Sequence, residues 1–222
     1  TNNKIIKKMK KSILTLAVLA FLFTSCEKVK LTFSGDIMIE LGSSDEDVLA
    51  FVSASDGSAV TVSGIDYNKA GEQTATFKAG NTTETKQVKV KADKLAGRYN
   101  IAVYSSDGSL MTTGDGWAMK ILEGDNYNQI KISSTIETGD KTIFTDTEYL
   151  IVTFNGKDEP EIDTYNGGIL CQSEPPTAEW EFSEITYGLD DKGKYSMSGF
   201  RMDGYTPGYN DFFYTVEFLR RK

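Results

Sequence analysis

The sequence predicts an all-β protein, with a β-sandwich over residues 26–93 followed by a second antiparallel β domain, a barrel or a sandwich, over residues 94–222. Two observations predict this class. Helical periodicity stops at residue 26, and short stretches of alternating polarity replace it. Gly, Asn and Asp turn signals separate these stretches at roughly 8–12-residue intervals, a spacing typical of sandwiches and barrels.

The composition excludes several classes of function. The formal net charge is -8, but five lysines lie ahead of residue 26, and the rest of the chain holds 19 basic and 32 acidic residues. Such an acidic body repels phosphate backbones, so we expect no nucleic-acid partner. The chain has no histidine, which excludes Ser-His-Asp and Cys-His catalysis. Its two cysteines, Cys26 and Cys171, are too few for a disulfide framework.

The first 25 residues have the pattern of a secretory signal peptide. A lysine-rich start is followed by an apolar segment over residues 13–23 and then by Thr24 and Ser25, directly before Cys26. As a helix the apolar segment would rise about 16 Å, roughly half of a bilayer core, which disfavours a permanent membrane span. We therefore expect residues 1–25 to be removed.

The residues Phe23, Thr24, Ser25 and Cys26 resemble the lipobox of bacterial lipoproteins, with Phe23 in place of the usual Leu. The resemblance implies that Cys26 becomes the acylated N-terminus and holds the protein on a lipid bilayer. Two or three acyl chains would make that attachment stable, because each buried CH₂ contributes about 0.8 kcal/mol. A buried free cysteine that happens to follow a signal peptide is the alternative.

Strands account for most of residues 27–93. Val88 and Val90 alternate with lysines, and Ala75, Phe77 and Ala79 share one face, so each segment predicts a half-buried strand. Further strands are expected at residues 29–34, 36–41, 48–54 and 59–64.

This region resembles the small immunoglobulin-like domains that follow the lipidated cysteine in Bacteroidetes-type surface lipoproteins. The resemblance covers about seventy residues, and the pattern that carries it comprises Val62, Gly64, Asp66, Gly71 and Phe77. It implies a spacer domain that holds a second domain away from the membrane.

The second domain begins after a junction at residues 92–97. Eight strands are expected, at residues 98–104, 109–113, 117–122, 127–136, 148–154, 179–187, 195–203 and 211–219. Residues 155–178 are expected to form a long loop that includes a solvated acidic run at 157–163. The opening LAGRYNI resembles the first strand of lipocalin-like bacterial domains.

The second domain is the candidate binding module, because it holds 19 of the 25 aromatic residues. Tyr205 and Tyr209 flank a Thr-Pro-Gly turn, where their rings could stack on a sugar or grip a peptide. Capping of the barrel end as core is the alternative for both. Trp117 and the neighbouring Asp115 are further candidates, with ordinary core and turn roles as their alternatives.

Other conspicuous residues have simpler interpretations. Alternation in EWEFSE sends Trp180 inward and Glu181 outward. No acidic segment has the spacing of a calcium loop, and Cys171 lacks a nearby histidine in sequence that could activate it. We expect no catalytic residue, no metal and no cofactor.

The whole arrangement resembles the accessory lipoproteins that accompany SusC/SusD-type importers of glycans or peptides. That resemblance implies a non-enzymatic outer-membrane lipoprotein, more consistent with the cell surface than with the periplasmic face. It would bind a nutrient oligomer or dock on the transporter. A purely structural subunit and a carboxylate-dependent glycosidase are the alternatives.

Overall fold

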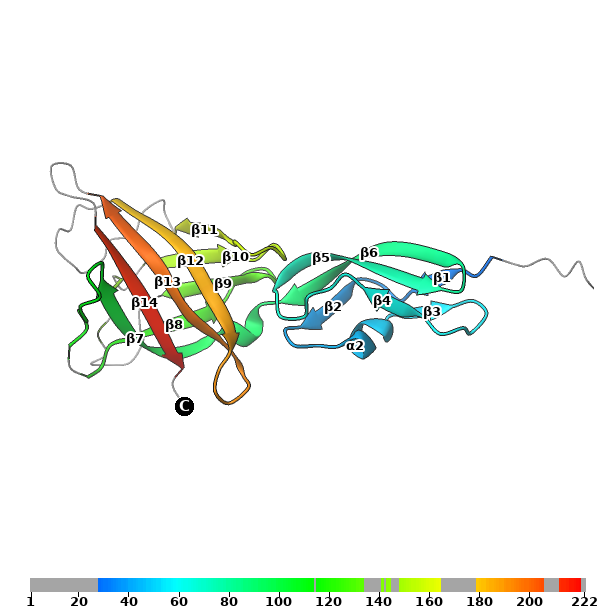
Figure 1. Cartoon of the computed structure of the whole chain (residues 1–222), viewed down its shortest axis with the longest axis horizontal. Coiled ribbons are helices and arrows are strands. Elements are labelled where there is room, and N and C mark those ends of the chain that lie inside the picture. Colours follow the sequence, from blue (N-terminus) through cyan, green and yellow to red (C-terminus); the bar gives the residue numbers. More distant parts are fainter. Residues whose placement is uncertain are drawn as a thin grey trace, which may run out of the picture.

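The protein is elongated, with two groups of sheets placed end to end (Figure 1). The computed structural model describes residues 28–113, 115–133, 141, 143–144, 148–164, 179–205 and 212–220. Nearly all regular elements are strands, so the predicted all-β class is confirmed.

The N-terminal group holds six strands in two sheets. Their bounds are β1 Leu31–Phe33, β2 Ile37–Glu40, β3 Val52–Ala54, β4 Thr61–Ser63, β5 Gly71–Ala79 and β6 Thr82–Lys91. β1 pairs with β3, and the four-stranded sheet has the order β2-β6-β5-β4, with β2 parallel to β6. The predicted alternation is confirmed, because Ala75, Phe77, Val88 and Val90 are fully buried.

One predicted strand in this group is partly a helix. Residues 48–54 were expected to be extended, but α2 (Asp45–Leu49) occupies the start of that segment and β3 only its end. The helix starts with a capping box, in which the backbone N–H of Ser44 donates to Asp47 at 2.8 Å. This local capping outweighs the β-like run of apolar residues that follows.

The C-terminal group is an eight-stranded antiparallel sheet curled into a nearly closed barrel. Its strands are β7 Gly97–Ser105, β8 Ala118–Glu123, β9 Gln129–Ser133, β10 Tyr149–Thr153, β11 Glu161–Thr164, β12 Glu179–Leu189, β13 Tyr195–Tyr205 and β14 Phe212–Arg220. The order β11-β10-β9-β8-β7-β14-β13-β12 is an up-and-down meander in which the first strand, β7, pairs with the last, β14. β11 and β12 are the two edges.

One strand prediction and one loop prediction in this group are wrong. Residues 109–113 form no strand beyond a single bridge between Tyr104 and Leu110. The acidic run expected as a loop instead supplies β11, whose main chain pairs with β10 from Leu150↔Thr164 to Thr153↔Glu161. A strand at a sheet edge needs only one partner and few apolar residues, which leaves little trace in the sequence.

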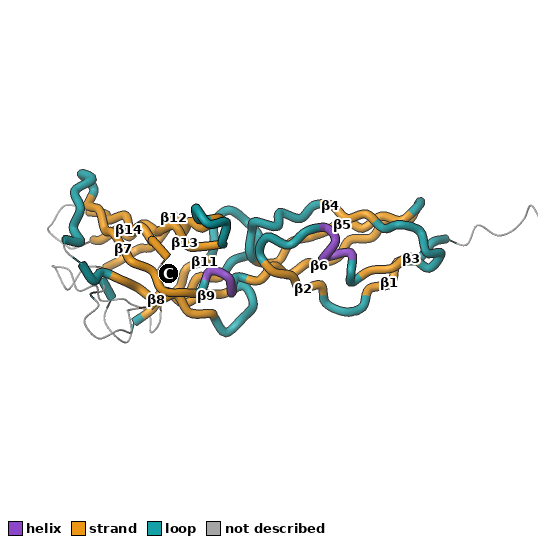
Figure 2. Tube along the Cα trace, turned by 90° about the horizontal axis from the view of Figure 1, so that it is seen from below, coloured by secondary structure: helices purple, strands orange, loops and turns teal. Residues whose placement is uncertain are grey.

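The barrel interior is packed with side chains. The rings of Phe144 and Phe182 meet edge to face at 6.0 Å, and Phe200 lies 5.7 Å from Phe218. Ile121, Ile130 and the other inward residues of β7–β10 are fully or nearly fully buried. The short helix η2 (Asp93–Leu95) contacts β8, β9 and β13 and is the purple segment next to β9 in Figure 2.

The two groups of sheets are joined by a dense junction. The Ala70 N–H donates to the Tyr187 hydroxyl at 3.0 Å, and the Gly156 N–H donates to the Ala70 carbonyl at 3.0 Å. Lys94 Nζ donates to the Leu41 carbonyl at 2.6 Å. A single apolar core runs from β1 to β14 through this junction, so the two groups form one packed body.

Candidate functional site

The barrel end that points away from the N-terminal sheets carries Tyr205, one of the aromatic residues predicted to bind ligand. The ends of β7 and β13 and the starts of β8, β12 and β14 meet there, because neighbouring strands run antiparallel (Figure 1). Tyr205 ends β13 and is 52% exposed. Tyr209 and both cysteines lie outside the described residues.

Trp117 lies directly before β8, opposite Ile101 in the middle of β7, and packs against the apolar core. Its indole Nε1–H donates to the Thr113 carbonyl at 3.3 Å, and Lys141 Nζ lies 5.8 Å from its ring centroid. Asp115 is exposed two residues earlier. β14 and β7 separate the strand of Tyr205 from that of Trp117, so the structure does not bring these two residues together.

A second aromatic group lines the inside of this barrel end. The Trp180 ring meets Phe212 at 5.5 Å and Tyr214 at 6.0 Å. Gly204 lies between them, and a Cβ there would come within 2.4 Å of Phe212. Trp180 therefore points inward, as its alternation predicted. Phe212 and Tyr214 were not singled out from the sequence, although their placement two residues apart in a strand gives them the same face.

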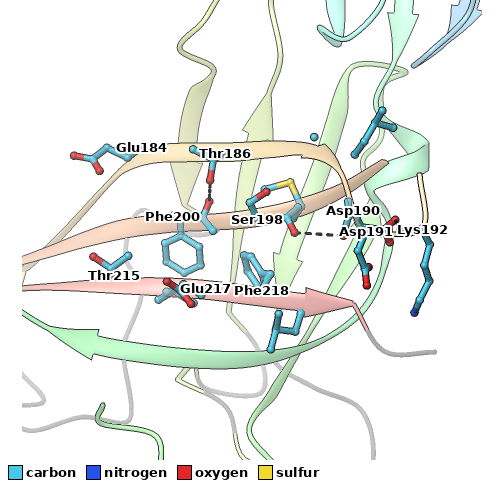
Figure 3. Close-up of a pocket in the computed structure, with 17 residues that line it drawn as sticks. Glu184, Thr186, Asp190, Asp191, Lys192, Ser198, Phe200, Thr215, Glu217 and Phe218 are labelled. Carbon is cyan, nitrogen blue, oxygen red and sulfur yellow. Dashed lines mark hydrogen bonds between the residues drawn. The ribbon is translucent and has the colours of Figure 1, made fainter. Parts of the chain in front are cut away.

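A groove of about 820 Å³ crosses the outer face of β12, β13 and β14 (Figure 3). Gly188 and Gly199 lie along it, together with Ser196 and Ser198. The Thr186 hydroxyl donates to the Gly199 carbonyl at 3.3 Å, drawn as a dashed line in Figure 3. The sequence analysis missed this groove. The available signal was the presence of glycine and serine inside strands, where larger side chains are usual.

Acidic side chains border the groove. Glu184, Glu217, Asp190 and Asp191 line it, against a single lysine, Lys192. At the outer border Arg201 lies 4.0 Å from Glu184 and forms a two-pronged pair with Asp203. The hydrogen bonds to Asp203 raise the pKa of the Arg201 guanidinium above its ordinary value.

No side-chain cluster suited to a metal ion occurs within the part of the chain that the structure describes. Among the same residues, no helix has the length and hydropathy to cross a bilayer. The barrel end and the groove together present an aromatic face, hydroxyls and carboxylates to a ligand.

The chain was compared with known proteins in three ways. No family model, no curated protein and no solved structure matches it.

Proposed function

We propose that this chain is a non-enzymatic, lipid-anchored lipoprotein of the bacterial outer membrane, accessory to a SusC/SusD-type importer. It binds a nutrient oligomer, a glycan or a peptide, or docks on the transporter itself. The observation that carries the proposal is the exposed Tyr205 at the barrel end opposite to the N-terminal sheets.

The placement of the lipid anchor fits this role. Cys26 precedes the first strand by only five residues, so an acyl chain at Cys26 would hold the N-terminal sheets next to the membrane. β13 adds 11 residues between the junction and Tyr205, about 33 Å at ~3.3 Å per residue. An aromatic rim at that distance can meet an oligomer clear of the lipid headgroups.

The junction supports the same proposal. A ligand-binding rim is presented in a fixed direction only if the spacer and the barrel do not rotate freely. The backbone contact between Ala70 and Gly156 and the packing of the Phe154 ring against Tyr187 at 5.0 Å restrain such rotation. The spacer and the barrel would then act as one rod.

A purely structural subunit is the second candidate function. It is favoured by the filled barrel interior, where Phe144 and Phe200 occupy the space in which many barrels hold a ligand. A glycosidase that uses two carboxylates is the third candidate and has no specific observation in its favour.

Titration calorimetry of the purified chain against a panel of oligosaccharides and peptides tests the binding function. We expect Tyr205→Ala, alone and with Tyr209→Ala, to weaken binding about tenfold or more, as loss of a stacking ring does. Met38→Ala, an exposed site on the N-terminal sheet, is the control. Unchanged binding in the double variant would remove the assigned site.

The anchor and the partner are tested on native membranes. Mass spectrometry should show an acylated Cys26 at the N-terminus, whereas an unmodified peptide that spans residues 25–27 would end the lipoprotein proposal. Co-purification with SusC/SusD-type proteins, without any soluble ligand, would favour the structural subunit.

A further inference from the structure

The groove across β12, β13 and β14 owes its depth to missing side chains. A Cβ on Gly188 would meet nothing within 4 Å, so the space above that residue is open. A Cβ on Gly199 would lie 2.3 Å from the Val216 carbonyl, so the close approach of β13 and β14 requires glycine there. The hollow is thus part of the sheet's own geometry.

Two exposed leucines stand at the border of this hollow. Leu189, at the end of β12, is 61% exposed, and Leu219, on β14, is 64% exposed. They lie on either side of β13, beyond the point where its pairing with β14 ends at Gly199↔Glu217. Large apolar side chains that flank a depression on a soluble protein are a common mark of a contact surface.

The border residues give the hollow a negative charge. Glu184, Glu217, Asp190 and Asp191 line it, against Lys192 within the groove and Arg201 beside Glu184 at its border. Carboxylates that share a concave surface attract cations and repel phosphates and other anions. A ligand for this groove therefore carries positive charge.

A β-bulge places one of these carboxylates at the groove. Glu184 is the one non-glycine residue with a positive φ, 51°, in the described part of the chain. It lies where the pairing of β12 with β13 shifts between Ser183 and Thr186, which marks a β-bulge. Bulges and left-handed non-glycine residues cost free energy and often redirect a side chain at a binding site.

We propose that this groove binds an extended peptide segment that carries lysine or arginine at alternate positions. The cationic head groups pair with Glu217, Glu184 and Asp191, while their methylene stems cover Leu189 and Leu219. Successive side chains of an extended segment face opposite ways, so the residues between the cationic ones face away from the groove. The inference rests on the proposed capture of an external oligomer and specifies its class as a cationic peptide.

The direct test is calorimetry with an acetylated and amidated Lys-Leu-Lys-Leu-Lys peptide. Glu-Leu-Glu-Leu-Glu and a neutral pentasaccharide are the comparison ligands. We expect binding by the lysine peptide alone. Its affinity should fall at least tenfold between about 50 mM and about 500 mM salt, because added ions screen exposed charge pairs.

Two variants locate the site. Gly188→Val places a side chain in the open space and should abolish binding, and Glu217→Lys should weaken it about tenfold. Glu181→Lys, on the exposed side of β12 but outside the groove, should bind as the wild type does. Far-UV circular dichroism checks that all three variants are folded.

The outcomes separate this inference from the proposed function. Failure of the lysine peptide to bind, or equal binding by the wild type and Gly188→Val, would overturn the groove assignment. If Tyr205→Ala removed binding of the lysine peptide while Gly188→Val left it unchanged, the groove assignment would be wrong and the proposed binding function would stand. If the native chain proved to be unacylated at Cys26 while its groove still bound the lysine peptide, the lipoprotein proposal would fail and the groove assignment would stand.

Discussion

At the scale of single residues, Tyr187 shows how one hydroxyl joins the two groups of sheets. Burial raises the pKa of this phenol, so it stays neutral and accepts the Ala70 N–H. Tyr187→Phe would leave that N–H without its acceptor, and we expect a loss of about 1 kcal/mol in the free energy of unfolding. Urea titration measures it. Tyr205→Phe, at the exposed barrel end, should change stability by less than about 0.5 kcal/mol; equal losses would contradict the junction role.

Asp107, in the turn after β7, gives a residue-scale prediction for pH. The Ser105 hydroxyl donates to its carboxylate at 2.5 Å and the Ser109 N–H at 2.9 Å. These hydrogen bonds lower the pKa of Asp107 from 3.8 to about 2. A carboxyl with a lowered folded-state pKa contributes stability above its unfolded value, and that stability is lost as pH falls through the folded value.

The stability difference between wild type and Asp107→Asn should therefore be constant above about pH 5 and shrink as the pH falls from about 5 towards about 2. Urea midpoints across this range measure the difference. A difference that does not change with pH would mean that the ionised carboxylate contributes nothing to this turn.

At the scale of elements, the start of β5 must pass very close to the segment after β10. Gly71 has φ 111°, and a Cβ there would lie 2.3 Å from the Gly156 nitrogen and 2.6 Å from the Phe154 carbonyl oxygen. Backbone atoms on both sides cannot move aside independently, so any side chain would push the two groups of sheets apart.

We expect Gly71→Ala to destabilise the protein by about 3 kcal/mol, combining overpacking with a left-handed backbone. The matched control is Gly57→Ala, which has φ 73° and open space around its Cβ. It should cost only about 1 kcal/mol. Denaturation curves that shift equally for the two variants would show that the close contact is unimportant.

Elements with strong alternation were predictable from sequence, and elements fixed by their neighbours were not. In β5 and β6, apolar residues alternate with polar ones, and the apolar residues Phe77, Val88 and Val90 are buried as predicted. α2 depends on the capping box between Ser44 and Asp47, which the apolar run after it obscured. β11 exists because β10 offers it a free edge, a property of the sheet that its own four residues do not encode.

The candidate sites divide in the same way. Tyr205 was predicted from its Gly/Pro turn, and the structure shows it exposed at a barrel end. Alternation of polarity did not reveal the groove, because the bulge near Glu184 shifts which residues of β12 and β13 share the outer face. A bulge interrupts the regular alternation of inward and outward residues. An analysis that assumes a period of two therefore misses residues that a bulge brings onto the same face.

At the scale of the whole molecule, the apolar core is continuous from the N-terminal sheets into the barrel. Leu41, Leu95 and Phe154 are buried at the junction, and the Tyr195 side chain hydrogen-bonds to Asn68 across it. When two groups of sheets share a core, unfolding of either group exposes to water part of the apolar surface that the other group had buried. The free energy of opening one therefore includes the cost of exposing part of the other.

We accordingly expect the chain to unfold in one cooperative transition. In hydrogen exchange monitored by mass spectrometry, peptides from β5–β6 and from β13–β14 should show the same highest free energy of opening. Gly71→Ala should lower protection in β5–β6 more than in β13–β14, because the barrel keeps its own closed pairing of β7 with β14. Gly57→Ala should lower protection in both pairs equally.

Wild-type protein in which β5–β6 opens at a clearly lower free energy than β13–β14 would mean that the junction transmits little stability. The spacer and the barrel would then move independently, and a rim held at a fixed distance from the membrane would lose its structural basis.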